Sequence, residues 1–405
     1  MYDRAVIGVT YPLGLTSTWY FLTHLFVYEC SLKLSNKEAV VTLQTRTGIR
    51  RLSLMSLFEA MATPHQIDRY LELVNPMATV RDLRAEVTEV RRTTADTVTL
   101  TLRPTRQWRG FEAGQFVQIG VVIDGVRHTR CYSPACSQHR ADGRIELTVK
   151  AHPQGLVSQY LHANAHPGLV VSLSQADGVF RMPARRPDKI LLISGGSGIT
   201  PVLSMLRTLL DEGHDGEITF LHYADTERDV AHRDELAQLV AGRDNVRVVL
   251  AYTGQPEGGD LHGFFGREHL ETAAPWHGEA QTYLCGPPGL MRGVREHFVR
   301  TGLVERLHTE EFTAPVAADE DATGLLTFTS SGVTAQNSGA SLLEQAEAAG
   351  LTPEYGCRMG ICFSCTAVKT SGCTRNLRTG ETDSDPDQPI QLCISAAVGD
   401  VSVDI

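Results

Sequence analysis

The sequence lacks the features that mark several classes of protein. It has no excess of basic charge, since 37 Lys and Arg stand against 47 Asp and Glu, and only 7% of its residues are aromatic. Without a basic stripe interleaved with aromatic residues, nucleic-acid binding is not expected. The chain also contains no internal repeat and no G-x-G-x-x-G turn, so neither a repeat protein nor a standard Rossmann fingerprint is indicated.

The cysteines cannot all be paired, because their number is odd. There are nine, and five of them lie between residues 357 and 393. An odd and clustered set argues against a secreted disulfide framework and favours a reducing compartment. We therefore expect a cytoplasmic protein, peripheral to the inner face of the membrane if a membrane-bound partner holds it there.

The first 54 residues are the least informative part. Residues 5–28 contain no Lys, Arg, Asp or Glu, which is long enough for a membrane span. Pro12, His24 and two glycines make the stretch less apolar than a typical span, and no clear signal-peptide cleavage site follows it. Residues 1–54 are therefore left as an unassigned extension: a membrane-associated segment, a disordered segment, or a stretch that precedes the authentic start at Met55.

The rest of the chain changes pattern several times. Residues 55–80 predict short helices divided at Pro64. Residues 81–185 contain short alternating runs such as DTVTLTLRP and RIELTVKA, which predict an antiparallel β-barrel. Over 186–312, apolar strands alternate with helical stretches, which predicts a doubly wound parallel sheet. Residues 313–323 read as a flexible linker rich in alanine and acidic residues, and 324–405 as a small α+β module.

Four cysteines near the carboxyl end have a distinctive spacing. Cys357-x₄-Cys362-x₂-Cys365 is followed by Cys393, and this spacing resembles that of plant-type ferredoxins, whose cysteines hold a [2Fe–2S] cluster. A structural zinc site is the alternative, but zinc sites usually pair two cysteine knuckles and the fourth cysteine here stands alone. Cys373, between the last two ligands, is interpreted as a bystander thiol.

Two earlier motifs suit a flavin. In Arg130-Cys131-Tyr132-Ser133, an arginine can neutralise a pyrophosphate, a tyrosine ring can stack on an isoalloxazine, and a serine can hydrogen-bond the flavin N5. Gly155-x-x-Ser158 opens an expected helix, whose amino end can accept phosphate oxygens. Taken alone, the first motif could equally be an ordinary strand with an exposed arginine.

Two further motifs suit a dinucleotide. The turn GGSGITP at 195–201 follows a buried strand and opens a helix, where glycine allows close approach of a pyrophosphate. Cys285-Gly286-Pro287 follows another strand, and a residue at the carboxyl end of a parallel strand faces the ligand crevice. A plain turn and a buried core thiol are the alternatives.

In this order, the five motifs resemble the ferredoxin–NADP reductase superfamily over about residues 80–405. More narrowly, they are similar to hybrid reductases with a C-terminal plant-type ferredoxin domain. The resemblance implies a multidomain NAD(P)H:acceptor oxidoreductase: an FAD-binding antiparallel barrel (FMN being the less favoured flavin), an NAD(P)-binding doubly wound α/β domain and a β-grasp [2Fe–2S] domain. The usual GTGxAP of the family reads GSGITP here, which keeps the hydroxyl.

The resemblance also implies roles for individual residues. The positions beside the reacting groups would be Ser133, Cys285 and Glu311, the last in the EEF sequence at the end of the α/β domain. The cluster ligands would be Cys357, Cys362, Cys365 and Cys393. The FAD-binding residues would be Arg130, Tyr132, Ser133, Thr148, Lys150, Gly155, Val157 and Ser158. The coenzyme-binding residues would be Gly196, Ser197, Gly198 and Thr200, with Gly286 and Pro287 beside the nicotinamide.

The resemblance places the electron acceptor among metalloenzymes. A membrane di-iron fatty-acyl desaturase is the expected acceptor, a ring-hydroxylating or other oxygenase is the alternative, and a redox-sensing module without steady turnover is a third hypothesis. The segment from Thr313 onward has 12 Asp and Glu against 4 Lys and Arg, a charge that either steers a basic partner or is only a solvated surface. The choice between NADH and NADPH stays open, because Arg228 and Arg233 could receive a 2′-phosphate while Asp225 and Glu227 could repel it.

Overall fold

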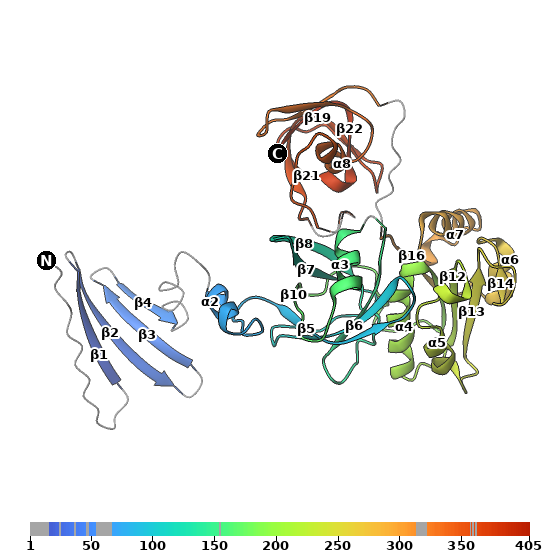
Figure 1. The fold of residues 1–405 in the computed structure, drawn as a ribbon, viewed down its shortest axis with the longest axis horizontal. Helices are drawn as coiled ribbons and strands as arrows, with labels where there is room; N and C mark the ends of the chain where they lie inside the picture. Colours follow the sequence, from blue (N-terminus) through green and yellow to red (C-terminus); the bar gives the residue numbers. More distant parts are fainter. Residues whose placement is uncertain are drawn as a thin grey trace. The chain divides into compact units, whose positions relative to one another are not determined.

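The computed structural model describes residues 16–23, 26–35, 38–45, 48–53, 67–153, 155–312, 322–356, 358, 360 and 363–405 (Figure 1). The chain divides into two compact units, Met1–Asp82 and Leu83–Ile405.

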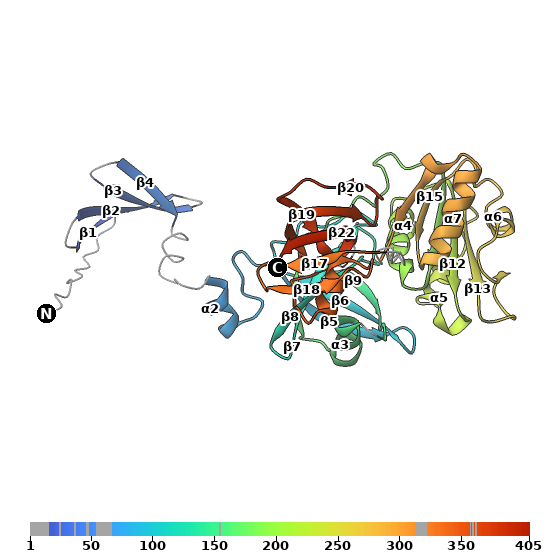
Figure 2. The same ribbon diagram turned by 90° about the horizontal axis from the view of Figure 1, so that it is seen from above.

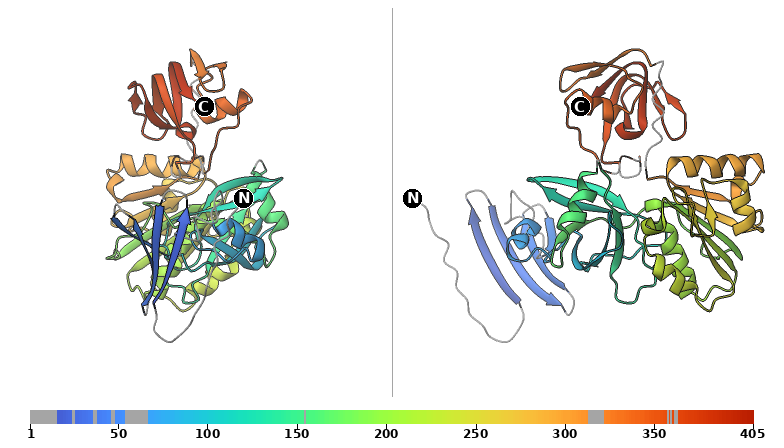
Figure 3. Two further views of the ribbon diagram at one scale, coloured as in Figure 1. Left: turned by 90° about the vertical axis from the view of Figure 1, so that its left-hand side faces the viewer. Right: turned by 45° about the vertical axis from the view of Figure 1, so that its right-hand side comes forward.

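The first unit contains an antiparallel sheet in which each strand pairs with the next (Figure 3). Its strands are β1 (Thr16–Thr23), β2 (Phe26–Ser35), β3 (Glu38–Thr45) and β4 (Gly48–Ser53). Sequence analysis left residues 1–54 unassigned and predicted no strand here. Among the helices in the described part of the chain, none combines the length and the apolar character needed to cross a membrane.

A short helix, α2 (Ile67–Val74), lies within the region expected to be helical. Its buried Asp68 accepts hydrogen bonds from the backbone N–H groups of Val80 (2.6 Å), Arg81 (2.8 Å) and Asp82 (2.8 Å). One carboxylate thus ties the helix to the segment that follows it. The helix expected before Pro64 lies outside the described residues.

The second unit begins with the predicted antiparallel barrel, which is confirmed. Its strands are β5 (Arg84–Arg92), β6 (Thr97–Pro104), β7 (Val117–Ile123), β8 (Val126–Tyr132), β9 (Ile145–Lys150) and β10 (Val170–Leu173), in the order β8-β7-β10-β5-β6-β9. An antiparallel bridge between Pro134 and Leu147 joins the two ends of the sheet. In β6 the apolar residues fill the barrel, while Thr97, Thr99 and Thr101 point outward and are nevertheless buried.

The predicted doubly wound domain is also confirmed. Its sheet is parallel throughout, in the order β14-β13-β12-β11-β15-β16, and the helices α4 and α5 pack on one face while α6 and α7 pack on the other (Figure 2). The strands are β11 (Lys189–Gly195), β12 (Glu217–Ala224), β13 (Val246–Tyr252), β14 (Leu261–His262), β15 (Gln281–Cys285) and β16 (Leu307–Glu310). The helices of this domain are α4 (Ile199–Asp211), α5 (Arg233–Val240), α6 (Arg267–Ala273) and α7 (Pro288–Arg300). The preceding helix, α3 (Leu156–Asn164), belongs to the barrel domain.

The carboxyl-terminal part has the expected α+β fold. Its strands are β17 (Leu325–Phe328), β18 (Val333–Gln336), β19 (Thr366–Asn376), β20 (Thr382–Asp383), β21 (Gln388–Gln391) and β22 (Ser395–Asp404), with the sheet order β18-β17-β22-β19-β20 and β21 paired to β19. The helix α8 (Leu342–Ala348; Figure 1) begins with a capping box between Ser341 and Glu344. Its leucines are buried in the core of this part. Residues 313–321 of the expected linker lie outside the described residues.

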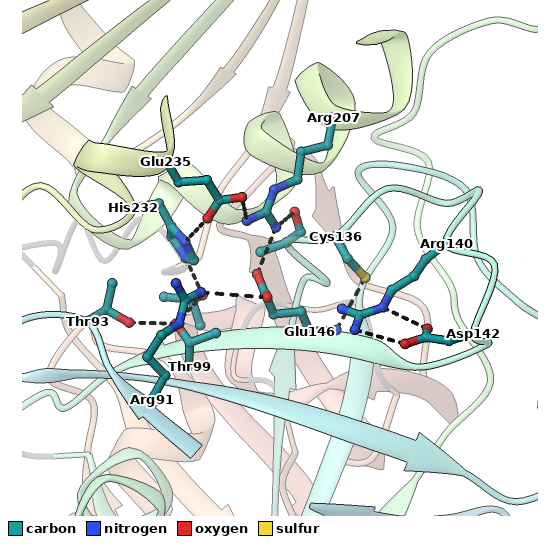
Figure 4. A network of polar contacts seen from close by, with 12 residues as sticks. Arg91, Thr93, Thr99, Cys136, Arg140, Asp142, Glu146, Arg207, His232 and Glu235 are labelled. Atoms are coloured by element: carbon teal, nitrogen blue, oxygen red, sulfur yellow. Dashed lines mark hydrogen bonds and ion pairs between the residues drawn. The ribbon is translucent and has the colours of Figure 1, made fainter. Parts of the chain in front are cut away.

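The helix α4 joins the barrel to the parallel sheet. Arg207, on this helix, donates a hydrogen bond to the carbonyl oxygen of Ala135 (2.6 Å) and forms ion pairs with Glu146 of β9 (2.8 Å) and Glu235 of α5 (Figure 4). On the same helix, Ser204 donates to the carbonyl oxygen of Cys136 (2.7 Å). Because Ala135 and Cys136 come two and three residues after Ser133, these bonds place the flavin motif against the α/β domain.

Removal of the Arg207 guanidinium should therefore destabilise the protein strongly. In Arg207→Met, two carboxylates would lose their common partner in a largely buried site, which typically costs about 3–5 kcal/mol. Urea unfolding measures the loss. The control is Arg103→Met, which breaks an exposed pair with Glu86 and should cost less than about 1 kcal/mol. Equal losses in the two variants would contradict the assigned role of Arg207.

Candidate active site and cluster loop

A row of polar residues crosses the carboxyl edge of the parallel sheet. Ser194 of β11 is in register with His222 of β12 and with Cys285 of β15, and Cys285 is in register with Glu310 of β16. Residues in register on parallel strands project from the same face, so these four side chains share one face. In open α/β sheets this edge is where ligands bind. The row is thus the natural floor of a ligand crevice.

Three members of this row, Ser194, His222 and Glu310, were not predicted from the sequence, and the first two lie close to each other. Ser194 Oγ lies 2.8 Å from His222 Nδ1, and both side chains are fully buried. Burial, with a smaller contribution from Lys150, lowers the pKa of His222 to about 3, so its imidazole is neutral. Within single strands these residues read as ordinary core positions; their alignment with Cys285 becomes visible only when the strands are paired.

Two turns at this edge are in direct contact. A β-carbon on Gly198 would lie 2.3 Å from the carbonyl oxygen of Cys285, and one on Gly195 would lie 2.7 Å from Cδ of Pro287. No larger residue fits at either position. By contrast, Gly196 has a φ of +53° and open space where its β-carbon would be. The first turn therefore presents bare backbone, which suits the close approach of a pyrophosphate.

The remaining coenzyme candidates divide by exposure. Ser197 is exposed at the tip of this turn, whereas Thr200 is buried and its hydroxyl donates to the carbonyl oxygen of Ser197 (3.3 Å). Thr200 therefore holds the turn together. Pro287 caps α7 at its amino end. Gly286 packs closely on Leu290 and on the backbone of Gly195.

Two polar atoms are buried where the barrel meets the parallel sheet. Ser133 Oγ and Glu310 Oε2 are both shielded from solvent and have no hydrogen-bond partner in the described part of the chain. Burial raises the pKa of Glu310 to about 8, although the nearby Ser133 hydroxyl opposes part of this rise. Burial, together with the charges of Glu310 and Glu311, also raises the pKa of Cys285. At neutral pH the site therefore contains a neutral thiol and a protonated carboxyl that can donate a hydrogen bond.

The structure distinguishes the two glutamates of the EEF sequence. Sequence analysis chose Glu311, which forms an ion pair with Arg295 of α7. Both glutamates act on the pKa of Cys285, but it is Glu310 that also lies beside Ser133. Alternation along β16 could have indicated this, because His308 stacks on Tyr283 and Glu310 shares the face of His308. We propose Glu310 for the role that was expected of Glu311.

In the flavin motif on β8, Tyr132 and Arg130 have different surroundings. Tyr132 is largely buried, and burial raises the pKa of its phenol. A guanidinium nitrogen of Arg130 donates to the carbonyl oxygen of Thr129 (2.8 Å) and to that of Gly356 (3.3 Å), and its guanidinium carbon lies 4.8 Å from the centre of the Tyr355 ring. The arginine expected to bind flavin pyrophosphate thus also contacts the segment immediately before Cys357.

The second flavin motif forms the start of α3. Gly155 is the N-cap, and a β-carbon there would lie 2.4 Å from Ser158 Oγ. Ser158 Oγ accepts the N–H of His152 (3.1 Å) and donates to the carbonyl oxygen of Gly155 (3.0 Å). Val157 is buried in the barrel core. These side chains shape the turn, so a phosphate would be met by the helix amino end.

The last two flavin candidates, both on β9, already have partners. Lys150 pairs with Asp96 (3.3 Å) near the surface. The Thr148 hydroxyl lies 3.0 Å from that of Thr99 and 2.7 Å from Nε2 of His232. Thr148 thus faces the α/β domain, and any contribution it makes to flavin binding is through its strand.

The cluster loop is described in part, because Cys357 and Cys362 lie outside the described residues. Cys365 and Cys393 are buried in one core, and the N–H of Leu392 donates to the carbonyl oxygen of Cys365 (3.0 Å). Gly360 has a φ of +74°, and a β-carbon there would lie 2.5 Å from Cδ1 of Ile394. The loop is therefore pressed against the neighbour of Cys393. Cys373 lies on β19 opposite Val398, which supports Cys393 as the fourth ligand.

These observations fit the flavin, the coenzyme and the iron–sulfur cluster that the sequence predicts. The two buried polar atoms between barrel and sheet match the polar edge of a flavin, the bare glycine turn matches a pyrophosphate, and the close loop with buried thiols matches an iron–sulfur cluster.

Comparison with known proteins gives the same sequence of domains. Family models match for an oxidoreductase FAD-binding domain at residues 84–182, an oxidoreductase NAD-binding domain at 192–296 and a 2Fe-2S iron-sulfur cluster binding domain at 326–397. The chain is 36% identical to an NADPH oxidoreductase of Mycobacterium tuberculosis, over 87% of this chain and 92% of the relative. The chain belongs to the ferredoxin–NADP reductase superfamily.

This reductase resembles other reductases along most of its length. It is 30% identical to the glycine betaine monooxygenase reductase subunit of Pseudomonas aeruginosa, over 73% of this chain and 87% of the relative. Its fold is similar to that of phthalate dioxygenase reductase, with a TM-score of 0.54 and 24% identity over 80% of this chain and 98% of that one. The reductase passes electrons from NAD(P)H through FAD to a [2Fe–2S] cluster.

The pKa of Glu310 predicts a pH dependence. If the protonated carboxyl is the active form, flavin reduction by NAD(P)H should slow as the pH rises through about 8, where the folded protein loses this proton. Glu310→Gln, which is neutral at every pH, should lose that dependence in a stopped-flow experiment. The matched control, Glu311→Gln, should keep it. An unchanged pH profile in Glu310→Gln would argue against the assignment.

The two candidates for the fourth cluster ligand can be separated directly. Cys373→Ser should retain the iron, the acid-labile sulfide and the visible absorption of a [2Fe–2S] cluster, because Cys373 lies on the sheet. Cys393→Ser should lose most of all three and keep the flavin, because thiolate is the ligand that the cluster requires. Cluster loss in Cys373→Ser alone would reverse the assignment.

Proposed function

We propose that this reductase is the electron-donating component of an oxygenase system. The internal electron route is supported by the contact of Arg130, from the flavin motif, with Tyr355 and Gly356, which directly precede the first cluster cysteine. In a chain that binds both groups, this contact links the motif that would hold the flavin to the loop that would hold the cluster. The oxygenase as acceptor is supported by the monooxygenase reductase subunit among the relatives.

Each group of residues has a distinct task in this proposal. The turn at 195–198 would bind the coenzyme pyrophosphate, with the neutral thiol of Cys285 beside the nicotinamide. Ser133 and the protonated Glu310 would provide a hydroxyl and a carboxyl proton where flavin and nicotinamide meet, in a site shielded from water. When bound, FAD accepts electrons in pairs from the coenzyme and the cluster carries them singly.

The names of the relatives bear on the acceptor and on the coenzyme. A monooxygenase reductase subunit among them supports an oxygenase as the acceptor, and an NADPH oxidoreductase supports NADPH as the electron source. Names of this kind support a turning-over enzyme rather than the sensing module. A fatty-acyl desaturase as acceptor, expected from the resemblance, stays a prediction.

The proposed route can be tested with two artificial acceptors. Ferricyanide can take electrons from a flavin directly, whereas cytochrome c reports delivery through the cluster in this design. We expect the Cys393→Ser variant to keep NADPH–ferricyanide activity and to lose NADPH–cytochrome c activity. Cys373→Ser should keep both. Equal cytochrome c activity in wild type and Cys393→Ser would show that the cluster is not on the route.

The acceptor itself requires a reconstituted system. The purified reductase and NADPH would be mixed separately with an iron oxygenase and with a membrane di-iron desaturase from the same organism, and product would be measured against coenzyme consumed. Tight coupling with the oxygenase alone is the expected result. Coupling with the desaturase alone would replace this proposal with the desaturase prediction.

A further inference from the structure

We propose that His232 is a positioning residue that couples the loop at 225–231, a candidate for contact with the coenzyme, to β9, the strand that carries the flavin candidates Thr148 and Lys150. This rests on the proposed function only in requiring that NAD(P)H and FAD bind where their motifs lie. His232 is the N-cap of α5 and follows the loop at 225–231, whose charged residues are the candidates for reading the coenzyme ribose. It has a φ of +62° and is buried. A non-glycine residue stays in this conformation only where its surroundings hold it.

Both nitrogens of the imidazole ring are engaged, on opposite sides of the domain boundary. Nε2 lies 2.7 Å from the Thr148 hydroxyl of β9, and Nδ1 lies 3.0 Å from a carboxylate oxygen of Glu235 (Figure 4). The chain of contacts continues into the barrel. The Thr148 hydroxyl lies 3.0 Å from that of Thr99, which lies 2.7 Å from that of Thr93.

The charge of Glu235 fixes the hydrogen bond at one end of this chain. Burial alone would raise the pKa of this carboxyl, but the bond with His232 and the charge of Arg207 lower it to about 2. Since a carboxylate only accepts, Nδ1 of His232 must donate to Glu235. Each hydroxyl beyond the ring can donate one hydrogen bond and accept another, so every contact from Nε2 through Thr148 and Thr99 to Thr93 can be satisfied at once.

Charged side chains from several elements surround the ring. Arg207 contacts both Glu146 and Glu235, and Arg91 lies 3.8 Å from Glu146. Glu89, Arg140 and Asp234 line the same space.

A polar cavity lies beside this link. Beside the network, α5 and β6 are separated by a polar cavity of about 480 Å³, lined among others by Thr99, Thr101, Asp234 and Gln238. Across this gap the first turn of α5 has two polar links to β9: His232 bonds Thr148, and Glu235 reaches Glu146 through Arg207. His232 is the direct one of the two, because its ring contacts the strand itself.

The coenzyme side of the link lies one residue away. Arg233, a candidate for binding a 2′-phosphate, forms ion pairs with Glu227 and with Asp234 (3.2 Å). Thr226 and Asp229 close the same loop with a capping box. A phosphate that draws Arg233 away from Glu227 would pull on the backbone next to His232. Through Thr148 this change reaches β9, the strand that leads to Lys150 and the Gly155 turn.

The test compares two buried histidines. His232→Asn keeps a residue that tolerates left-handed backbone, but its short amide cannot reach both Thr148 and Glu235. The matched control is His269→Asn, because His269 is also buried and its Nδ1 bonds the Tyr223 hydroxyl (2.9 Å) within the α/β domain. Both variants should bind FAD and assemble the cluster. Single-turnover flavin reduction by NADPH should fall about tenfold in His232→Asn, because small misplacement of reacting groups costs at least this much, and should be unchanged in His269→Asn.

A second measurement does not depend on turnover. In hydrogen–deuterium exchange, NADP⁺ should protect both the start of α5 and β9 in the wild type and in His269→Asn. In His232→Asn it should protect α5 alone. Adding Thr148→Val to His232→Asn should cause no further loss of rate, because both substitutions break the same contact.

The outcomes separate the two proposals. A His232→Asn variant that unfolds more easily but keeps both the wild-type rate and the protection of β9 would overturn the coupling role. A wild-type protein that reduces its flavin with NADPH but delivers electrons to no oxygenase would overturn the proposed acceptor and leave the coupling intact.

Discussion

The site depends on one buried guanidinium. Arg207 binds the chain just after the flavin motif, a strand of the barrel and a helix of the α/β domain at once. Its positive charge is what allows Glu146 and Glu235 to lie in the same partly buried space. Since Ser133 comes from the barrel and Cys285 and Glu310 from the parallel sheet, the candidate active site exists only because these two domains meet in this way.

Where the barrel meets the parallel sheet, three ionisable side chains are uncharged near neutral pH. Burial keeps the Cys285 thiol and the Glu310 carboxyl protonated and the His222 imidazole uncharged near neutral pH. A site without fixed charge suits the transfer of hydride between two large, flat ring systems, because no charge has to be solvated when water is displaced. The charged residues lie at the edges, where phosphates would bind.

The cluster loop is connected to the flavin side by aromatic and cationic contacts. The Tyr355 ring has the guanidinium of Arg130 at 4.8 Å and that of Arg358 at 3.9 Å, and Arg358 also pairs with Glu347 of α8. Although burial opposes it, the two arginines lower the pKa of Tyr355. The same side chains can therefore hold the loop in place beside the flavin motif. If Arg130 turns toward a flavin phosphate, Tyr355 keeps its contact with Arg358.

The local pattern of the sequence was sufficient for much of this protein. Periods of two and then of alternating strand and helix predicted the barrel and the doubly wound sheet, and glycine positions such as Gly198 and Gly360 were recognisable because only a residue without a side chain fits there. The pairing of strands was not accessible in the same way. The alignment of Ser194, His222 and Glu310 with Cys285 and the bond between His232 and Thr148 all join residues far apart in the chain. Backbone preferences act over a few neighbouring residues, whereas burial, pKa and hydrogen-bond partners are set by whatever the fold brings alongside, so these features were decided by the tertiary structure alone.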